Sequence, residues 1–151
     1  MNEAIKMIIS GVVGTFGFAI IFGVKAKRLP YTTLGSFLIC VIYVISASLG
    51  VFASNAIASF AVTIYCEAIS RQQKAPVVVF LTPSLIPLVP GGSLYNTVSN
   101  LIYKQYDEFI MYALQTCDTC LGIAAGILLA SLFASVLRSF FEKMRAKRGV
   151  S

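Results

Sequence analysis

The sequence has no histidine and few charged residues, and both shortages restrict what the protein can do. Without histidine, the chain lacks the commonest general base and metal ligand. Charged residues make up 12% of the 151 residues and hydrophobic residues 58%, with a mean hydropathy of +0.85. Soluble domains carry about 25% charged residues, so this composition is typical of a membrane protein.

Cysteine is scarce too, and its spacing excludes the usual metal and redox sites. The four cysteines are Cys40, Cys66, Cys117 and Cys120. The last two form one C-x-x-C pair, "CDTC", without the second pair or the histidines that a zinc site needs. No nucleophile, base and acid combine into a catalytic set. We therefore expect no enzymatic activity, no metal and no cofactor.

The chain contains four uncharged intervals: Met7–Val24, Leu29–Cys66, Ala75–Tyr103 and Thr119–Leu137. A bilayer core is crossed by about 20 helical residues. The second interval, 38 residues long, would form a helix of about 57 Å, which suits two crossings with a turn near Gly50. We predict an all-α integral membrane protein with about five transmembrane helices in a single domain, residues 1–151. The expected spans are about 5–24, 31–49, 52–70, 76–102 and 109–137.

Ten of the twelve basic residues fall in three groups, and five crossings place all three groups on one side of the membrane. The groups are Lys25, Lys27 and Arg28; Arg71 and Lys74; and Arg138, Lys143, Arg145, Lys147 and Arg148. The positive-inside rule then predicts a plasma-membrane protein with its N-terminus outside and residues 138–151 as a basic cytoplasmic tail. The basic residues are not interleaved with aromatic side chains, so we expect no nucleic-acid partner.

Two acidic residues lie in or near the expected spans, where a buried carboxylate is costly and marks a candidate functional site. Glu67 precedes Arg71 by four residues, so an ion pair on the helix surface is the simpler interpretation. Asp118 lies at the outer interface if the last helix begins at Thr119, and about 13 Å inside the membrane if it begins near Phe109. Asp118 and Glu67 are the candidates for proton coupling.

The last expected span has a small residue at every fourth position, a pattern that lets another helix approach closely in lipid. These helix-packing residues are Gly122, Gly126, Ala130 and Ala134. The stripe suits a helix of the same chain or of a second chain. We expect a homo-oligomer or a hetero-oligomer in the lipid bilayer.

The segment Thr82–Gly92, "TPSLIPLVPGG", places three prolines and two glycines inside the fourth expected span. Each proline removes a backbone hydrogen bond, and Gly91-Gly92 favours a non-helical link. We expect two half-helices joined by an elbow within about residues 83–92, near mid-membrane, with Ser93 as the N-cap of the second half. Free N–H groups at Gly91–Leu94 would bind an anionic group. A purely structural kink is the alternative.

Broken helices of this kind bind substrate in secondary transporters. The candidate substrate-binding residues are Pro87, Pro90, Gly91, Gly92, Ser93, Tyr95, Asn96 and Asn100. We expect a substrate carboxylate at the Gly91–Leu94 backbone, with Tyr95, Asn96 or Asn100 contacting the rest of the molecule.

The motif "PSLIPLVPGGSLYNTV" resembles the proline-rich "P-x-x-P-x-x-P-G" segment of the threonine/serine exporter (ThrE-type) family. The glycine-rich opening "GVVGTFGFAIIFGVKAKRLP" and the chain length are similar to the small, separately encoded subunit that corresponds to the C-terminal membrane part of fused exporters. Pro87, Pro90, Gly91 and Tyr95 match the motif. The resemblance implies proton-driven export of threonine and serine, or of dicarboxylates such as succinate. It also implies a larger partner subunit.

A non-transporting scaffold or assembly subunit is the competing function. Its small-residue helix faces would then serve assembly alone. A pore is disfavoured because no expected span carries a continuous polar stripe.

Overall fold

A computed structural model describes residues 2–148, and within them every regular element is a helix. The α-helices are α1 (Asn2–Ile21), α2 (Leu29–Ser46), α3 (Val51–Gln72), α4 (Val78–Leu85), α5 (Gly91–Ile102) and α6 (Tyr106–Arg148). Three short 3₁₀ helices lie between them: η1 (Ala26–Arg28), η2 (Ala47–Leu49) and η3 (Ile86–Leu88).

Within the described residues, three helical stretches are long and apolar enough to cross a membrane: Ala26–Leu49, Val51–Gln72 and Tyr106–Leu137. The bent pair Val78–Leu88 and Gly91–Ile102 is a fourth if its halves form one span. The apolar part of α1, Ile5–Ile21, extends only about 26 Å, against roughly 30 Å for a bilayer core. The predicted all-α membrane fold is confirmed, while a fifth crossing through α1 stays a prediction.

Two glycines with positive φ form the turns that follow α1 and α2. Gly23 (φ 68°) ends α1, where the Val24 amide donates to Ala19 O and the Gly23 amide to Ile20 O, both at 3.0 Å. This is a common way for a helix to end, and glycine adopts it without strain. Gly50 (φ 94°) separates η2 from α3, which confirms the turn predicted at this residue.

The fourth expected span is broken at its last proline. After η3, Val89 is extended (φ −60°, ψ 125°), and α5 starts at Gly91 with a bend of 52° between the two halves. We name Val89–Pro90 the elbow. Pro90 cannot donate a backbone hydrogen bond, so the helix ends here and a new one begins.

Two local predictions at the elbow are wrong. Gly91 and Gly92 do not form a non-helical link, because they are the first two residues of α5. Ser93 is not the N-cap, because Pro90 occupies that position and no side chain caps the helix there. The extended Val89 and the proline ring already separate the halves, so the glycines are free to enter the first helical turn.

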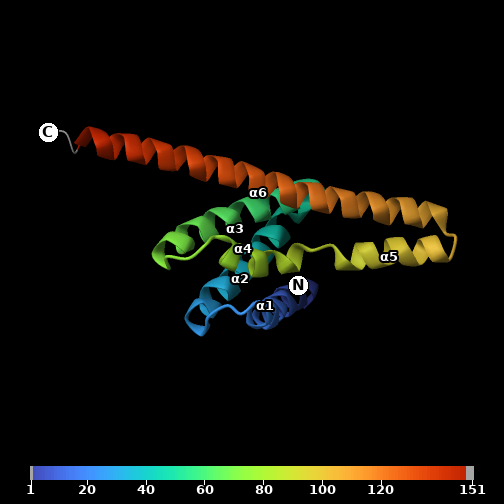
Figure 1. Cartoon of the computed structure of the whole chain (residues 1–151). Coiled ribbons are helices and arrows are strands. Elements are labelled where there is room, and N and C mark those ends of the chain that lie inside the picture. The colour runs from blue at the N-terminus through green and yellow to red at the C-terminus, as the bar shows by residue number, and fades with distance from the viewer. Residues whose placement is uncertain (1, 149–151) are drawn as a thin grey trace.

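The central bundle has α2, α3 and α4 around one apolar core, with α1 against α2 on one side and α6 against α3 on the other (Figure 1). The buried core residues are Ile39, Cys40, Ala58, Val62, Cys66, Ile69, Phe80 and Leu88. Figure 1 also shows α5 lying beside the N-terminal half of α6, away from α1. Because α6 continues to Arg148, it is about 65 Å long and extends past the expected span 109–137.

Buried hydroxyl groups join three of these helices. Thr15 Oγ1 donates to Ser36 Oγ at 2.8 Å, and Ser36 Oγ donates to Gly11 O at 3.2 Å, which links α1 to α2. Ser84 Oγ lies 3.1 Å from Thr32 O, which links α4 to α2. In lipid, helix association depends on such hydrogen bonds and on close packing, because apolar contact alone gives little preference for protein over acyl chains.

The small-residue stripe of α6 packs inside this chain, against α3. A Cβ on Gly122 would meet Phe52 O, and a Cβ on Gly126 would overlap Ser59 Oγ and Ala56 O. Ala130 and Ala134 continue the same face and are buried. The stripe is therefore occupied by α3, so any contact with a second chain must use another surface.

Candidate functional site

A polar hollow of about 190 Å³ lies at the elbow. Its lining comes from α1, α2, α3, η3, the elbow, α5 and α6. The lining residues are Met7, Tyr43, Val51, Asn55, Pro87, Leu88, Val89, Pro90, Ser93, Gln115 and Thr119. We name this cavity the elbow hollow. At roughly 30 Å³ per water molecule, it has room for about six waters, which matches a small solute rather than a peptide.

The apolar side of the elbow hollow is fixed by a close approach of α1 to η3. A Cβ on Gly11 would lie 2.9 Å from Cys40 Sγ and 3.2 Å from Pro87 Cβ, so a larger residue at this position would push the helices apart. Leu88, next to Pro87, is buried in the core with 4% of its surface exposed. Close packing of Pro87 against α1 and of Leu88 in the core therefore fixes the position of the elbow.

The first turn of α5 supplies two open backbone donors. The Gly91 amide donates to Val89 O at 2.8 Å and the Leu94 amide to Pro90 O at 2.9 Å. The amides of Gly92 and Ser93 have no acceptor among residues 2–148. The anion-binding stretch predicted at Gly91–Leu94 thus narrows to two N–H groups at a helix N-terminus.

Side chains from α3 and α6 supply the other polar groups of the elbow hollow. Asn55 Nδ2 donates to Val51 O at 2.8 Å, and its carboxamide oxygen has no partner in the described part of the chain. Thr119 Oγ1 donates to Gln115 O at 2.9 Å, which leaves its lone pairs available. Asn55 is only 2% exposed, so its orientation is fixed by packing. Hydrogen-bond acceptors thus lie in the same cavity as Ser93, one of the two residues with an open amide, and the other, Gly92, flanks this cavity.

Three of the predicted binding residues, Pro87, Pro90 and Ser93, line the elbow hollow. Gly91 and Gly92 flank it beside open space, since a Cβ on either would meet nothing within 4 Å. The other three lie along α5 and do not line the elbow hollow.

These three are Tyr95, Asn96 and Asn100. Tyr95 is 72% exposed, whereas Asn100 is buried with 8% of its surface exposed. Asn96 is half-buried. Since α5 packs on α6, the buried Asn100 lies between these helices, almost two turns beyond Ser93.

The two acidic candidates lie outside the elbow hollow. Glu67 Oε2 is 3.7 Å from Arg71 Nη2, the expected i,i+4 ion pair. It is about 24 Å along α3 from Val51, at the far end of the helix. Asp118 is one residue from Thr119 but is exposed. It lies one turn before Gly122, which packs on Phe52 at the start of α3, so α3 does not reach it.

The elbow hollow lies at the end of the bundle where α3 begins. Val51 and Asn55 belong to the first turns of α3, and Tyr43 is one turn from the end of α2. Along the broken pair itself, the elbow lies between two halves of similar length, Val78–Leu88 and Gly91–Ile102. Its position near mid-membrane therefore stays a prediction.

The sequence did not single out Met7, Tyr43, Asn55, Gln115 or Thr119. Asn55 carried a usable signal, because it is the only carboxamide in the uncharged interval Leu29–Cys66. Gln115 and Thr119 are four residues apart and share a helix face. Nothing local to either segment indicates that the two faces meet at the elbow.

Helices of membrane-spanning length, a bent pair of apolar helices and a polar cavity at the bend define a polytopic membrane protein of the kind that carries small solutes. A family model described as Threonine/Serine exporter, ThrE, matches residues 7–133. The chain therefore belongs to the threonine/serine exporter family, which agrees with a non-enzymatic function. No curated protein and no solved structure matches the chain.

Proposed function

We propose that this chain is the small subunit of a two-part secondary transporter that exports small carboxylate-bearing metabolites across the plasma membrane. Threonine and serine are the first candidates, and dicarboxylates such as succinate are the second. The N-terminus faces outside and the C-terminus the cytoplasm. The observation that carries this proposal is the elbow hollow, whose lining combines Ser93, with its open backbone amide, and the side-chain acceptors of Asn55 and Thr119.

The polar groups of the elbow hollow suit the two ends of an amino acid. The amides of Gly92 and Ser93, at the positive end of α5, would donate to the carboxylate. The carboxamide oxygen of Asn55 and the hydroxyl oxygen of Thr119 would accept from the ammonium group or the side-chain hydroxyl. A dicarboxylate would satisfy the donors and leave these acceptors without a donor, so the geometry favours threonine and serine.

A partner subunit is supported by the surroundings of Asp118. This carboxylate is exposed within Tyr106–Leu137, a stretch apolar enough to span a membrane. Leu114 and Leu121 on either side of it are 62% and 60% exposed. An aspartate cannot face acyl chains at low cost, so a second protein surface or a water-filled path must cover this face. We propose that the larger subunit does so, and that Asp118 carries the coupled proton.

The test compares two threonines on α6 whose hydroxyl groups both donate to the carbonyl four residues earlier. Thr119 lines the elbow hollow, whereas Thr116, bonded to Tyr112 O at 2.8 Å, does not. Thr119→Val removes one hydrogen bond to the substrate and should weaken threonine efflux about two- to tenfold at sub-saturating substrate. Thr116→Val should leave it unchanged. Efflux of labelled threonine is measured in a strain of the native host from which the gene for this chain has been deleted. Each variant is expressed in that strain from a plasmid.

Equal efflux by the two variants would contradict the position of the site. Asp118→Asn should remove the pH dependence of efflux, whereas Glu67→Gln, which breaks the ion pair with Arg71, should keep it. The scaffold alternative is separated by replacing Gly91 and Gly92 with leucine, since both glycines adjoin open space. Loss of efflux with an intact complex supports a binding site. Loss of the complex itself supports a scaffold.

A further inference from the structure

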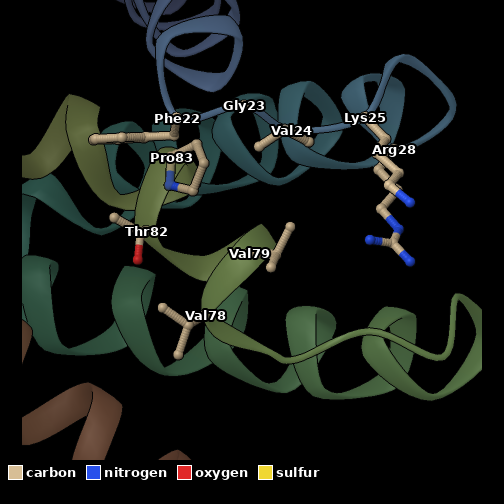
Figure 2. Close-up of a pocket in the computed structure, with 9 residues that line it drawn as sticks. All are labelled: Phe22, Gly23, Val24, Lys25, Arg28, Val78, Val79, Thr82 and Pro83. Carbon is tan, nitrogen blue, oxygen red and sulfur yellow. The ribbon is translucent and has the colours of Figure 1, made fainter.

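A second hollow, of about 360 Å³, opens between the end of α1 and the start of α4. Its lining residues are Phe22, Gly23, Val24, Lys25, Arg28, Val78, Val79, Thr82 and Pro83 (Figure 2). We name it the α1–α4 hollow. It shares no lining residue with the elbow hollow and adjoins the basic segment after α1, whereas the elbow hollow adjoins the start of α3.

The α1–α4 hollow has an apolar part and a cationic part. Figure 2 shows Phe22 and Pro83 toward one side, with Lys25 and Arg28 together at the other. Phe22 and Val78 are 54% and 66% exposed, so the apolar part opens to the surroundings of the bundle. Gly23 adds no side chain to the lining of the hollow, and the space beside it is open, since a Cβ there would meet nothing within 4 Å.

The two cations also line an adjoining hollow of about 430 Å³, whose other lining residues are Ala26, Lys27 and Gln73. Arg28 Nη2 donates to Gln73 O at 3.3 Å, which holds the guanidinium at this rim. Among the described side chains, no carboxylate lies within ion-pair distance of Lys25, Lys27 or Arg28. Three positive charges thus lie beside an apolar slot, and none has an anionic partner among the side chains that the structure describes.

We propose that the α1–α4 hollow binds a phospholipid with an anionic headgroup. One acyl chain lies along Phe22, Val79 and Pro83, and the phosphate binds Lys25 and Arg28. Charge complementarity selects this occupant, because the two linings combine an apolar slot with Lys25, Lys27 and Arg28 and contain no carboxylate. A zwitterionic amino acid would place its ammonium group among these cations, where the lining offers no carboxylate to neutralise it. Basic pockets between transmembrane helices on the cytoplasmic side bind such headgroups.

The absence of tryptophan from the sequence allows a direct test. Phe22→Trp places the chain's single tryptophan in the apolar part of the α1–α4 hollow. The variant is reconstituted into vesicles of phosphatidylcholine with a minor fraction of phosphatidylglycerol, and either lipid is supplied with brominated acyl chains that quench tryptophan on contact. Phe52→Trp, on the first turn of α3 and 47% exposed, reports ordinary lipid contact elsewhere.

The proposal predicts that brominated phosphatidylglycerol quenches Trp at position 22 more than fivefold better, per lipid, than brominated phosphatidylcholine. No such preference is expected at position 52. Lys25→Gln should lower the preference about fivefold, the effect of one basic residue at an anionic surface. Lys74→Gln is the matched control, since Lys74 belongs to the basic residues predicted to be cytoplasmic but lines neither cationic hollow. It should leave the preference unchanged.

The source of the phosphate is separated by adding excess inorganic phosphate at constant ionic strength. A preference that survives this addition supports a lipid, while one that phosphate abolishes assigns the cations to a free anion and overturns the proposal. Equal quenching by both lipids would also overturn it, as would the same loss in Lys74→Gln as in Lys25→Gln. The readout is independent of transport, so it stands whether or not the elbow hollow binds substrate.

Discussion

The contact between α3 and α6 can be tested by adding one methyl group at Gly126. A Cβ at this position would overlap Ser59 Oγ and Ala56 O and lie 2.9 Å from Phe60 N. Two of these atoms belong to the backbone and cannot rotate away. The third is held by a hydrogen bond from Ser59 Oγ to Asn55 O at 2.7 Å. The helices must therefore separate, because no side-chain rotation relieves the overlap.

Overpacking of this kind costs about 1–3 kcal/mol, and replacing glycine with alanine in a helix gains up to about 1 kcal/mol. We expect Gly126→Ala to lower the free energy of unfolding by about 1–2 kcal/mol. Gly17 in α1 is the matched control, because a Cβ there would meet nothing within 4 Å. Gly17→Ala should be neutral or more stable by up to about 1 kcal/mol. The measurement is reversible unfolding in mixed micelles, followed by circular dichroism. If Gly126→Ala is as stable as Gly17→Ala, the close packing of α3 and α6 is refuted.

Two further predictions concern smaller energies. Ser84→Ala removes the hydroxyl that lies 3.1 Å from Thr32 O. It should lower the free energy of unfolding, measured in the same assay, by about 0.6 kcal/mol and by at most about 1.7 kcal/mol. A larger loss would mean that the packing of α2 on α4 depends on more than this contact. Glu67→Gln breaks the ion pair with Arg71, in which the Arg71 side chain is 53% exposed and the Glu67 side chain 17%. Because solvent screens the exposed guanidinium, the change should alter stability by no more than about 0.5 kcal/mol. A loss above 1 kcal/mol, on the order of a buried pair, would show that solvent does not screen it.

Much of the fold could be predicted from the sequence because lipid imposes strong rules. A helix must be apolar over its crossing, so the positions of charged residues mark its ends. Gly50 marks a turn because it takes a φ of 94° that other residues rarely adopt. Pro90 marks a break because it has no amide hydrogen. These rules act on single residues or short segments, and a sequence shows such segments directly.

The lining of the elbow hollow could not be predicted in the same way. Asn55 and Thr119 are 64 positions apart, and they meet only because Gly122 and Gly126 set α6 against α3 in one rotation. The same rotation leaves Asp118 exposed, one turn beyond the part of α6 that α3 covers. α6 begins at Tyr106, before Phe109, which is the helix start for which the sequence places Asp118 inside the membrane, and that depth stays a prediction.

The conformation of Gly91 and Gly92 could not be predicted from the backbone preferences of glycine alone. Glycine permits a non-helical link but does not require one, and in this chain the elbow is complete at Pro90. The polar residues of α5 cannot be sorted by sequence for a similar reason. Asn100 lies between α5 and α6 and does not line the elbow hollow, because a polar side chain on a membrane helix also serves packing against its neighbour.

The central claim is that the elbow hollow is an accessible cavity that binds the exported solute. It is tested most directly by thiol protection of Ser93→Cys, in a chain whose two exposed cysteines, Cys117 and Cys120, are replaced by alanine. The native Cys40 and Cys66 are buried and can remain. Ser99→Cys, on the same helix but outside the elbow hollow, is the control. Threonine should slow the reaction of a small maleimide with Cys at position 93 and leave position 99 unaffected. A thiol at position 93 that never reacts, or that reacts at one rate with and without threonine, serine and succinate, would contradict the account.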